Sequence, residues 1–291
     1  MNNSKIEDMI DKMLVKNNTS SEYEVSKDAM KSYLMYPCCS VGWYIEGNKL
    51  KSCAEGYELT ADIITSIKKP LNDFLESINE EKIYKDGSVI VNCICENKKV
   101  ICEEITPYLK SFATVYYFIG NMMPVKCSFS PGAYGADNWK YKMTRILEFY
   151  KIDSKNDKDK RGQNNNWPDW LINHSGLNKN AFIKNNYLMD CFCDDTFEEC
   201  KFFIDSKYQE AHKYDNRLIF GKEREENIEL MKKWIIRNTK IIIQRSYRIL
   251  NKFDKEWDVE HENEVREICK YIFKKSGIKE KDIEEYVVSL F

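Results

Sequence analysis

Residues 223–253, EREENIELMKKWIIRNTKIIIQRSYRILNKF, carry the longest helical pattern of the chain and decide the expected fold. Ile235, Ile242 and Ile249 recur every seven residues, so an α-helix places them on one face. Between positions 230 and 253 there are seven basic residues and no acidic residue. These are Lys232, Lys233, Arg237, Lys240, Arg245, Arg248 and Lys252, and all but the first fall within one arc on the opposite side. We therefore expect a long helix with one apolar and one basic face.

The basic face of this helix has two alternative interpretations. It could follow the phosphates of a nucleic acid, because each such contact is electrostatic and needs only a suitably placed cation. The candidate contacts are Lys233, Arg237, Lys240 and Arg248. Alternatively, residues 254–267, which contain seven acids and two bases, could fold back onto the basic face. The sequence leaves both alternatives open.

The rest of the chain predicts an α+β fold that is predominantly helical, with a small antiparallel sheet and a helical C-terminal half. Helical periods occur at 4–16, 260–274 and 282–290, and a helix interrupted near Pro70 is expected over 60–78. The strongest strand signal is SVIVNCIC at 88–95, followed by the turn ENKK and by VIC, which predicts a hairpin near 88–102.

A polar segment, KIDSKNDKDKRGQNNN at 151–166, predicts an exposed loop. We expect a single domain over 1–291. A subdivision at this loop, into an α+β part at 1–150 and a helical part at 167–291, stays open.

Composition excludes several classes of protein. The 45 basic and 47 acidic residues give a net charge of −2, so any preference for nucleic acid or an anionic membrane has to be local. The N-terminus lacks the apolar core of an export signal, and no apolar run is long enough to span a bilayer. The abundance of Lys, Asn and Ile is typical of an AT-rich bacterial genome. We therefore expect a cytoplasmic bacterial protein with its 11 cysteines reduced, no cofactor and no membrane partner.

The stretch 116–150, YYFIGNMMPVKCSFSPGAYGADNWKYKMTRILEFY, supplies the first candidate site. Gly120 permits a close backbone approach and Asn121 offers both donors and acceptors, which suits a turn that grips a ligand. Asp137 and Trp139 follow a loop of small residues and complete this candidate ligand site. Helix capping by the aspartate and core packing by the tryptophan are the alternative roles.

Cysteine triplets and clustered acids supply two further candidates. Cys93-x-Cys95 with Cys102, and Cys191-x-Cys193 with Cys200, have the same spacing, which permits either zinc binding or small core residues. Asp190, Asp194 and Asp195 could hold Mg²⁺ for chemistry on phosphates. Acids at the start of a helix also complement the helix dipole, which is the alternative role.

Three short motifs resemble a family of uncharacterised bacterial proteins. They are Ile-Gly-Asn-x-x-Pro at 119–124, Asp137-x-Trp139, and Asn-Tyr-Leu-Met-Asp at 186–190, and the resemblance covers roughly 105–205. Lys126 stands where the family often has a second proline. The resemblance implies no activity, but it implies that Asn121, Asp137, Trp139 and Asp190 share one neighbourhood.

The sequence therefore predicts a ligand-binding or protein-interaction module, with an unknown small ligand or protein partner and an oligomeric state that it does not determine. The alternative is a metal-dependent enzyme acting on nucleic acid or a nucleotide, with the three aspartates as ligands and 230–253 as the phosphate track.

Overall fold

The computed structural model describes the parts of the chain that build a helical body and a short backbone sheet. Described are residues 1–14, 43–46, 49–52, 58–63, 65, 67–83, 90–91, 94, 102–126, 183–184, 187–191, 220–251 and 258–291. For the strands, at 43–63 and 122–126, the backbone alone is described. Side-chain statements therefore concern the helical body.

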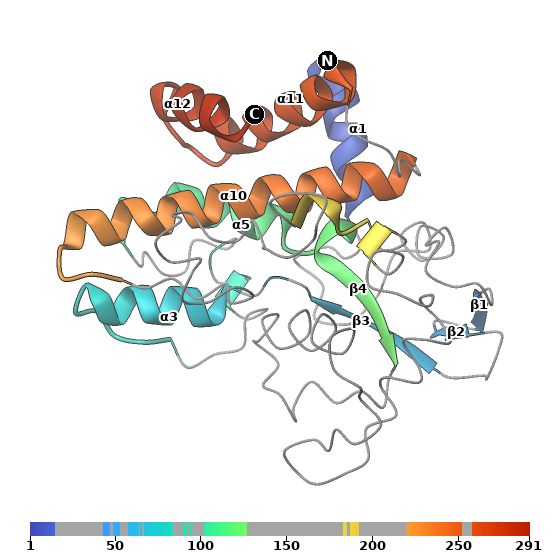
Figure 1. Ribbon diagram of the computed structural model, residues 1–291, viewed down its shortest axis with the longest axis horizontal. Coiled ribbons are helices and arrows are strands. Elements are labelled where there is room, and N and C mark those ends of the chain that lie inside the picture. Colours follow the sequence, from blue (N-terminus) through green and yellow to red (C-terminus); the bar gives the residue numbers. More distant parts are fainter. Residues whose placement is uncertain are drawn as a thin grey trace, which may run out of the picture.

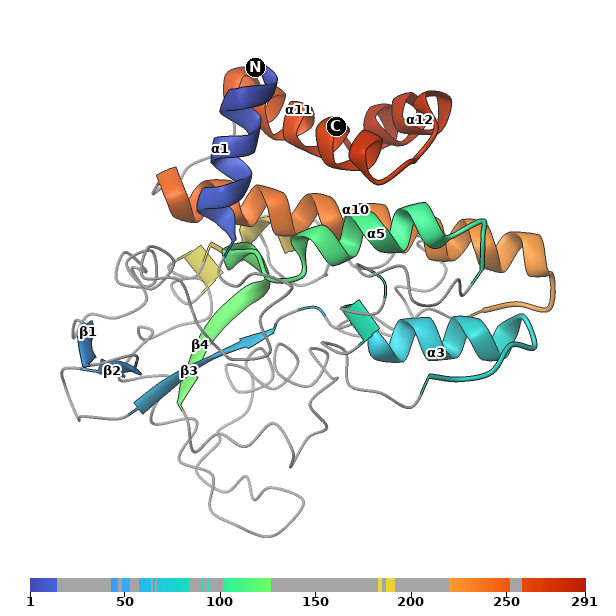
Figure 2. The same cartoon turned by 180° about the vertical axis from the view of Figure 1, so that it is seen from behind.

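The long helix α10 (Arg224–Asn251) runs through the middle of the helical body, as Figure 1 shows. Helices α3 (Lys68–Ser77) and α5 (Thr106–Val115) pack against it. Helices α11 (Val259–Lys275), α12 (Glu280–Leu290) and α1 (Asn3–Met13) lie on the other side of α10 from α3 (Figures 1 and 2). Because α10 has neighbours around its circumference, its side chains are buried on several faces.

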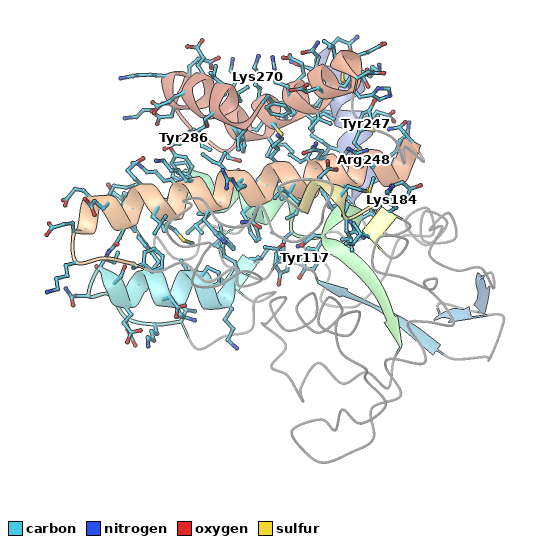
Figure 3. The ribbon with its side chains drawn as sticks, viewed as in Figure 1. Tyr117, Lys184, Tyr247, Arg248, Lys270 and Tyr286 are labelled. Atoms are coloured by element: carbon cyan, nitrogen blue, oxygen red, sulfur yellow. The ribbon has the colours of Figure 1, made fainter. Side chains whose placement is uncertain are left out.

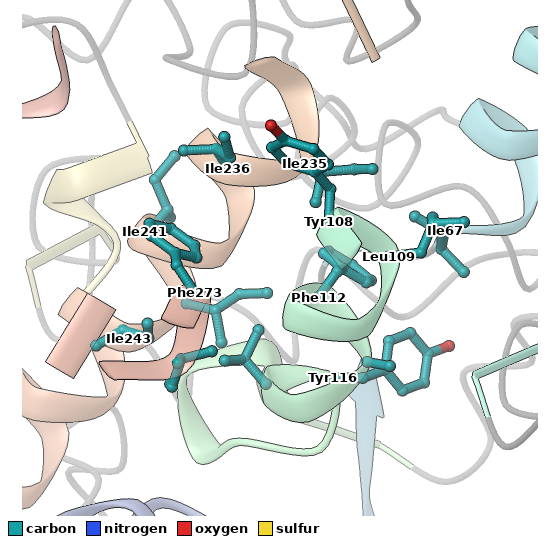
Figure 4. Packing of buried hydrophobic residues seen from close by; sticks show 14 of the residues in the cluster. Ile67, Tyr108, Leu109, Phe112, Tyr116, Ile235, Ile236, Ile241, Ile243 and Phe273 are labelled. Atoms are coloured by element: carbon teal, nitrogen blue, oxygen red, sulfur yellow. The ribbon is translucent and has the colours of Figure 1, made fainter. Parts of the chain in front are cut away.

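Aromatic and branched side chains fill the space between α5 and α10. The Phe112 and Trp234 rings lie 5.8 Å apart between their centroids, and both side chains are almost completely buried. Tyr108 and Leu109 on α5 lie in the same cluster as Ile235 on α10 (Figure 4). Burying a large apolar side chain stabilises a fold by about 1.5–3 kcal/mol, so this interface fixes α5 on the central helix.

Local signals explain where the helices begin and end. The Asn2 side chain accepts a hydrogen bond from the backbone N–H of Lys5 at 2.9 Å and so caps α1. Asp258 caps α11 in the same way through the N–H of His261, at 2.9 Å. At the other end of α11, Gly277 has a φ of +88°, and the N–H of Ile278 reaches back to the carbonyl of Phe273 at 3.1 Å. This is the glycine-terminated helix end that favours a residue without a Cβ.

The strands form a separate backbone ladder with the order β1-β2-β3-β4, antiparallel throughout. Their bounds are Trp43–Glu46 (β1), Lys49–Ser52 (β2), Glu58–Ile63 (β3) and Met122–Lys126 (β4). Strand β4 directly follows the 3-10 turn η1 (Ile119–Asn121), which packs on α10. The ladder is thereby joined to the helical body through η1.

The predicted fold class, α+β with a sheet at 88–102, is wrong. Helices, including 3-10 turns, account for 76% of the residues whose side chains are described, and those residues include no strand. Ile90, Val91 and Ile94 are helical and buried instead of forming the predicted hairpin. Spacings of one, three and four residues place these three side chains on one helix face, and a short apolar run alone does not distinguish a strand from such a buried helix.

The helix predicted over 60–78 also needs correction. Residues 58–63 form β3, and α3 begins at Lys68, with Pro70 in its first turn. Among the described helices, none combines the length and the apolar character that crossing a membrane requires.

Candidate functional site

Gly120, the first residue of the predicted ligand site, is a contact point between η1 and α10. Its N–H donates to Ser246 Oγ at 2.9 Å, and that hydroxyl donates to the carbonyl of Ile242 at 2.7 Å. A Cβ on residue 120 would lie 2.1 Å from the same carbonyl oxygen. Close backbone packing against α10 therefore requires glycine at this position.

Asn121 is completely buried, and its side-chain amide makes hydrogen bonds to the backbone at Thr65 and Tyr116. The side-chain Oδ1 accepts from the N–H of Thr65 at 2.8 Å. The Nδ2 group donates to the carbonyls of Thr65 at 3.2 Å and Tyr116 at 2.8 Å. Both amide hydrogens are thus engaged, and Asn121 connects segments 56 positions apart in the sequence. The other two predicted ligand-site residues, Asp137 and Trp139, lie outside the described residues.

Asp190, a predicted metal ligand, forms a buried ion pair with Arg248. The Arg248 Nε and Nη2 atoms lie 2.5 and 3.0 Å from the two carboxylate oxygens, and Gln244 Nε2 donates to Oδ1 at 3.1 Å. Arg248 lies towards the C-terminal end of α10 (Figure 3). One turn earlier, Arg245 Nη1 donates to the carbonyl of Gly120 at 2.7 Å. We call Gly120, Asn121, Asp190, Arg245, Ser246 and Arg248 the buried polar junction.

Asp190 is neutralised by Arg248 within the junction, which argues against an open metal site at Asp190. The side chains of Arg248 and Asp190 are only 4% and 7% exposed, so an ion that replaced the guanidinium would leave a buried cation without a partner. Asp194 and Asp195 lie outside the described residues. Within the part of the chain that is described, no three His, Cys, Asp or Glu residues are grouped closely enough to hold a metal.

The predicted basic face of α10 is divided between solvent and core. Lys233 is exposed, Arg237 and Lys240 are half-buried, and Arg248 is buried. Lys240 Nζ donates to the carbonyl of Leu290 and lies 4.0 Å from the centre of the Phe291 ring. The C-terminal end of α12 thus covers part of the face on which the nucleic-acid prediction depends.

Residues 258–267 of the acid-rich segment lie in or just before α11, which packs on α10 and bonds to it through Tyr247. Helix α11 packs along α10, and Tyr247 Oη donates to Glu264 Oε2 at 2.5 Å. Glu264 also pairs with Lys5 Nζ at 2.9 Å, so one carboxylate joins three helices. These two bonds lower the pKa of Glu264.

The cysteines with described side chains are free thiols with raised pKa values. Burial raises the pKa of Cys269 to about 12. Burial, and then the hydrogen bond from Sγ to Glu104 Oε2 at 2.9 Å, raise the pKa of Cys102. A thiol with a raised pKa is a poor nucleophile at neutral pH. The side chains of the other triplet members, Cys93, Cys95, Cys191, Cys193 and Cys200, lie outside the described part.

An open pocket of about 400 Å³ lies where α1, α5 and α11 meet, and the sequence did not predict it. Figure 2 shows α1 running down to α10 beside one end of α5, with α11 extending above α5 from the upper end of α1. The lining residues are Glu7, Ile10 and Asp11 on α1, Lys110 and Thr114 on α5, and Tyr271, Ile272, Lys275 and Ser276 on or just after α11. The volume is within the range of sites that bind small molecules.

Two of the charged side chains in the pocket neutralise each other. Tyr271 Oη donates to Glu7 Oε1, and Lys275 Nζ lies 3.1 Å from the same oxygen. The tyrosine bond and then the lysine lower the pKa of Glu7, while the same tyrosine and Glu7 raise the pKa of Lys275. This group fixes the wall formed by α1 against α11.

The other two charged side chains, Asp11 and Lys110, line the pocket without a partner among the described residues. No hydrogen bond or ion pair joins the Asp11 carboxylate or the Lys110 ammonium to the described part of the chain. Asp11 also lies in the last turn of α1, where the helix dipole disfavours a negative charge. Both groups are therefore available to a ligand, and for Asp11 the fold gains nothing from the charge.

The chain has no significant match among protein-family models, curated proteins or solved structures. The functional proposal therefore depends on the geometry of the pocket.

Proposed function

We propose that this chain is a ligand-binding protein that holds a small molecule in the pocket between α1, α5 and α11. The observation that carries the proposal is a pocket of about 400 Å³ in which Asp11 and Lys110 have no partner among the described residues. The buried polar junction supports it indirectly. The N–H of Gly120 and the side-chain amide of Asn121 are engaged by the protein, so these two residues give a ligand little to bind.

The pocket also offers hydrogen-bond acceptors and apolar contact. Thr114 Oγ1 donates to the carbonyl of Lys110 at 2.9 Å, and Ser276 Oγ donates to that of Ile272 at 2.8 Å. Both hydroxyl hydrogens are engaged, so the oxygens remain as acceptors. Ile10 and Ile272 supply apolar surface. A few polar groups on an apolar lining is the composition typical of small-molecule sites.

The same hydrogen bonds favour binding over catalysis. Nucleophilic catalysis by a hydroxyl needs a base beside it, and the hydrogens of Thr114 and Ser276 point to backbone carbonyls. Neither histidine nor cysteine is among the residues that line the pocket. We therefore assign reversible binding, without a chemical step, to this site.

A screen with blocked variants tests the proposal. A panel of small metabolites is screened by thermal shift against the natural protein, and each hit is measured again with Thr114→Trp and Ile10→Trp, which fill the pocket from two helices. Ser4→Trp, at an exposed position of α1 outside the pocket, is the matched control. Hits should be lost in both blocked variants and kept in the control. Hits that bind the blocked variants unchanged, or a panel without hits, would contradict the proposal.

A further inference from the structure

We infer that the ligand of this pocket is a small zwitterion, with its anionic group on Lys110 and its cationic group on Asp11. The inference rests on the proposed function and adds the chemical class of the ligand. It depends on which charges in the pocket are neutralised and which are not.

The charged groups of the pocket balance in pairs. Its ionisable side chains are Glu7, Asp11, Lys110, Tyr271 and Lys275. Glu7 is paired with Tyr271 and Lys275, so among the described residues only the Asp11 carboxylate and the Lys110 ammonium of the pocket have no partner. A simple anion could pair with Lys110, but it would leave Asp11 without a cation. A simple cation could pair with Asp11, but it would leave Lys110 without an anion. A ligand that carries both charges would neutralise both side chains.

The positions of Asp11 and Lys110, which have no partner in the described part of the chain, set the shape of the ligand. Asp11 is on α1 and Lys110 is on α5, and no ion pair joins the two side chains across the pocket. Ile10 is the neighbour of Asp11 in the sequence, and the aliphatic part of Thr114 is one helical turn from Lys110. A short hydrocarbon between an amino group and a carboxylate therefore matches the lining. A charge-assisted hydrogen bond of about 1.5 kcal/mol corresponds to about a tenfold change in affinity.

Matched probes test the class directly. Calorimetric titration uses straight-chain ω-amino acids from β-alanine to ω-aminocaprylate, each beside the carboxylate and the amine of the same chain length. Leucine, with isocaproate and isoamylamine as its matched compounds, covers the case in which both charges sit on one carbon. At least one zwitterion should bind about tenfold more tightly than either matched compound, and the preference should weaken with added salt.

Charge exchange identifies the two contacts. Lys110→Glu should lower the affinity for the best zwitterion about tenfold or more and favour the matched amine, whereas Asp11→Lys should favour the matched carboxylate. The double exchange should recover the zwitterion, bound in the reverse direction. Lys281→Glu, an exposed reversal on α12 outside the pocket, is the control and should change nothing.

The possible failures are distinguishable. If a matched carboxylate or amine binds as tightly as the zwitterion and Thr114→Trp abolishes that binding, the pocket function stands and the zwitterion class is overturned. The zwitterion class is also overturned if no zwitterion binds but another compound does bind, and Thr114→Trp abolishes the binding of that compound. If no compound of any class binds in that manner, both the class and the proposed function are overturned.

Discussion

The buried polar junction and the pocket contain similar polar side chains, but the protein uses them in opposite ways. At the junction, Asp190 meets two nitrogen atoms of Arg248, and both amide hydrogens of Asn121 reach carbonyls. In the pocket, Asp11 and Lys110 have no partner in the described part of the chain. Burial explains the difference, because a buried charge or amide is costly unless it is paired, whereas an exposed one is solvated. Polar or charged residues that look unusual in a sequence can thus belong to a binding site or to a core in which each polar group is paired. The burial of the side chain and the positions of its partners distinguish the two.

The largest expected effect is at the Asp190–Arg248 ion pair. Arg248→Met should lower the free energy of unfolding by about 3–5 kcal/mol, because it leaves the Asp190 carboxylate buried without its cation. Urea denaturation measures the loss. Lys233→Met, on an exposed side of the same helix, is the control and should stay within about 0.5 kcal/mol.

A second variant separates the ion pair from simple packing. Asp190→Leu combined with Arg248→Met removes both charges and should recover much of the loss. An Arg248→Met protein as stable as the natural one would show that the junction is not a satisfied core, and the comparison with the pocket would break.

A smaller loss is expected from Gly120→Ala. The added methyl group would lie 2.1 Å from the Ile242 carbonyl oxygen, so η1 has to move away from α10, at a cost of about 1–3 kcal/mol in unfolding free energy. Ser246→Ala should not rescue the variant, because the nearest clash is with backbone. Gly221→Ala is the control, since its Cβ would meet nothing closer than 3.9 Å. Equal stability of the two alanine variants in thermal or urea unfolding would refute the close approach.

A still smaller effect on the free energy of unfolding, one that depends on pH, is expected at Glu104. This side chain is less buried than the junction and, unlike Asp11, has partners among the described residues. The bond from Cys102 Sγ–H and then the Arg224 guanidinium, 2.9 Å away, lower the pKa of Glu104 from 4.5 to about 2. A lowered pKa in the folded state stabilises the fold above pH 4.5, and the contribution is lost as the pH falls towards 2. The effect is small because the Arg224 and Glu104 side chains are 47% and 44% exposed.

Comparison of unfolding curves at several pH values checks this expectation. Glu104→Gln should be slightly less stable than the natural protein at pH 6 and should converge with it as the pH approaches 2. Glu80→Gln, at an exposed position of the loop after α3, is the control. A constant difference between Glu104→Gln and the natural protein across this range would contradict the lowered pKa.

Long periodic helices were predictable from the sequence, whereas short apolar runs were not. The pattern at 223–253 corresponds to α10 at Arg224–Asn251, and the period at 260–274 corresponds to α11 at Val259–Lys275. Many turns of consistent spacing outweigh local ambiguity. The hairpin near 88–102 failed because Ile90, Val91 and Ile94 satisfy a helical face as well as a strand.

The sites were less predictable than the helices. Gly120, Asn121 and Asp190 were identified as unusual residues, but their engagement in the core depends on contacts with segments more than 50 positions away. The pocket had no local signal, because its residues come from three helices separated by about 100 positions or more. Such a site follows from packing and not from any motif.

The smallest stability effect is expected in the pocket, and it completes the comparison. Asp11→Asn should change the free energy of unfolding by less than about 0.5 kcal/mol, because the exposed carboxylate has no described partner. Its sign should be stabilising, since the change removes a negative charge from the C-terminal turn of α1. Asp8→Asn, which breaks the 2.6 Å pair with Lys12 on the same helix, is the matched control and should be slightly destabilising. Opposite signs for the two variants in urea unfolding would show that the fold does not depend on the Asp11 charge. A clear loss of stability in Asp11→Asn would show instead that Asp11, like the groups of the junction, stabilises the fold.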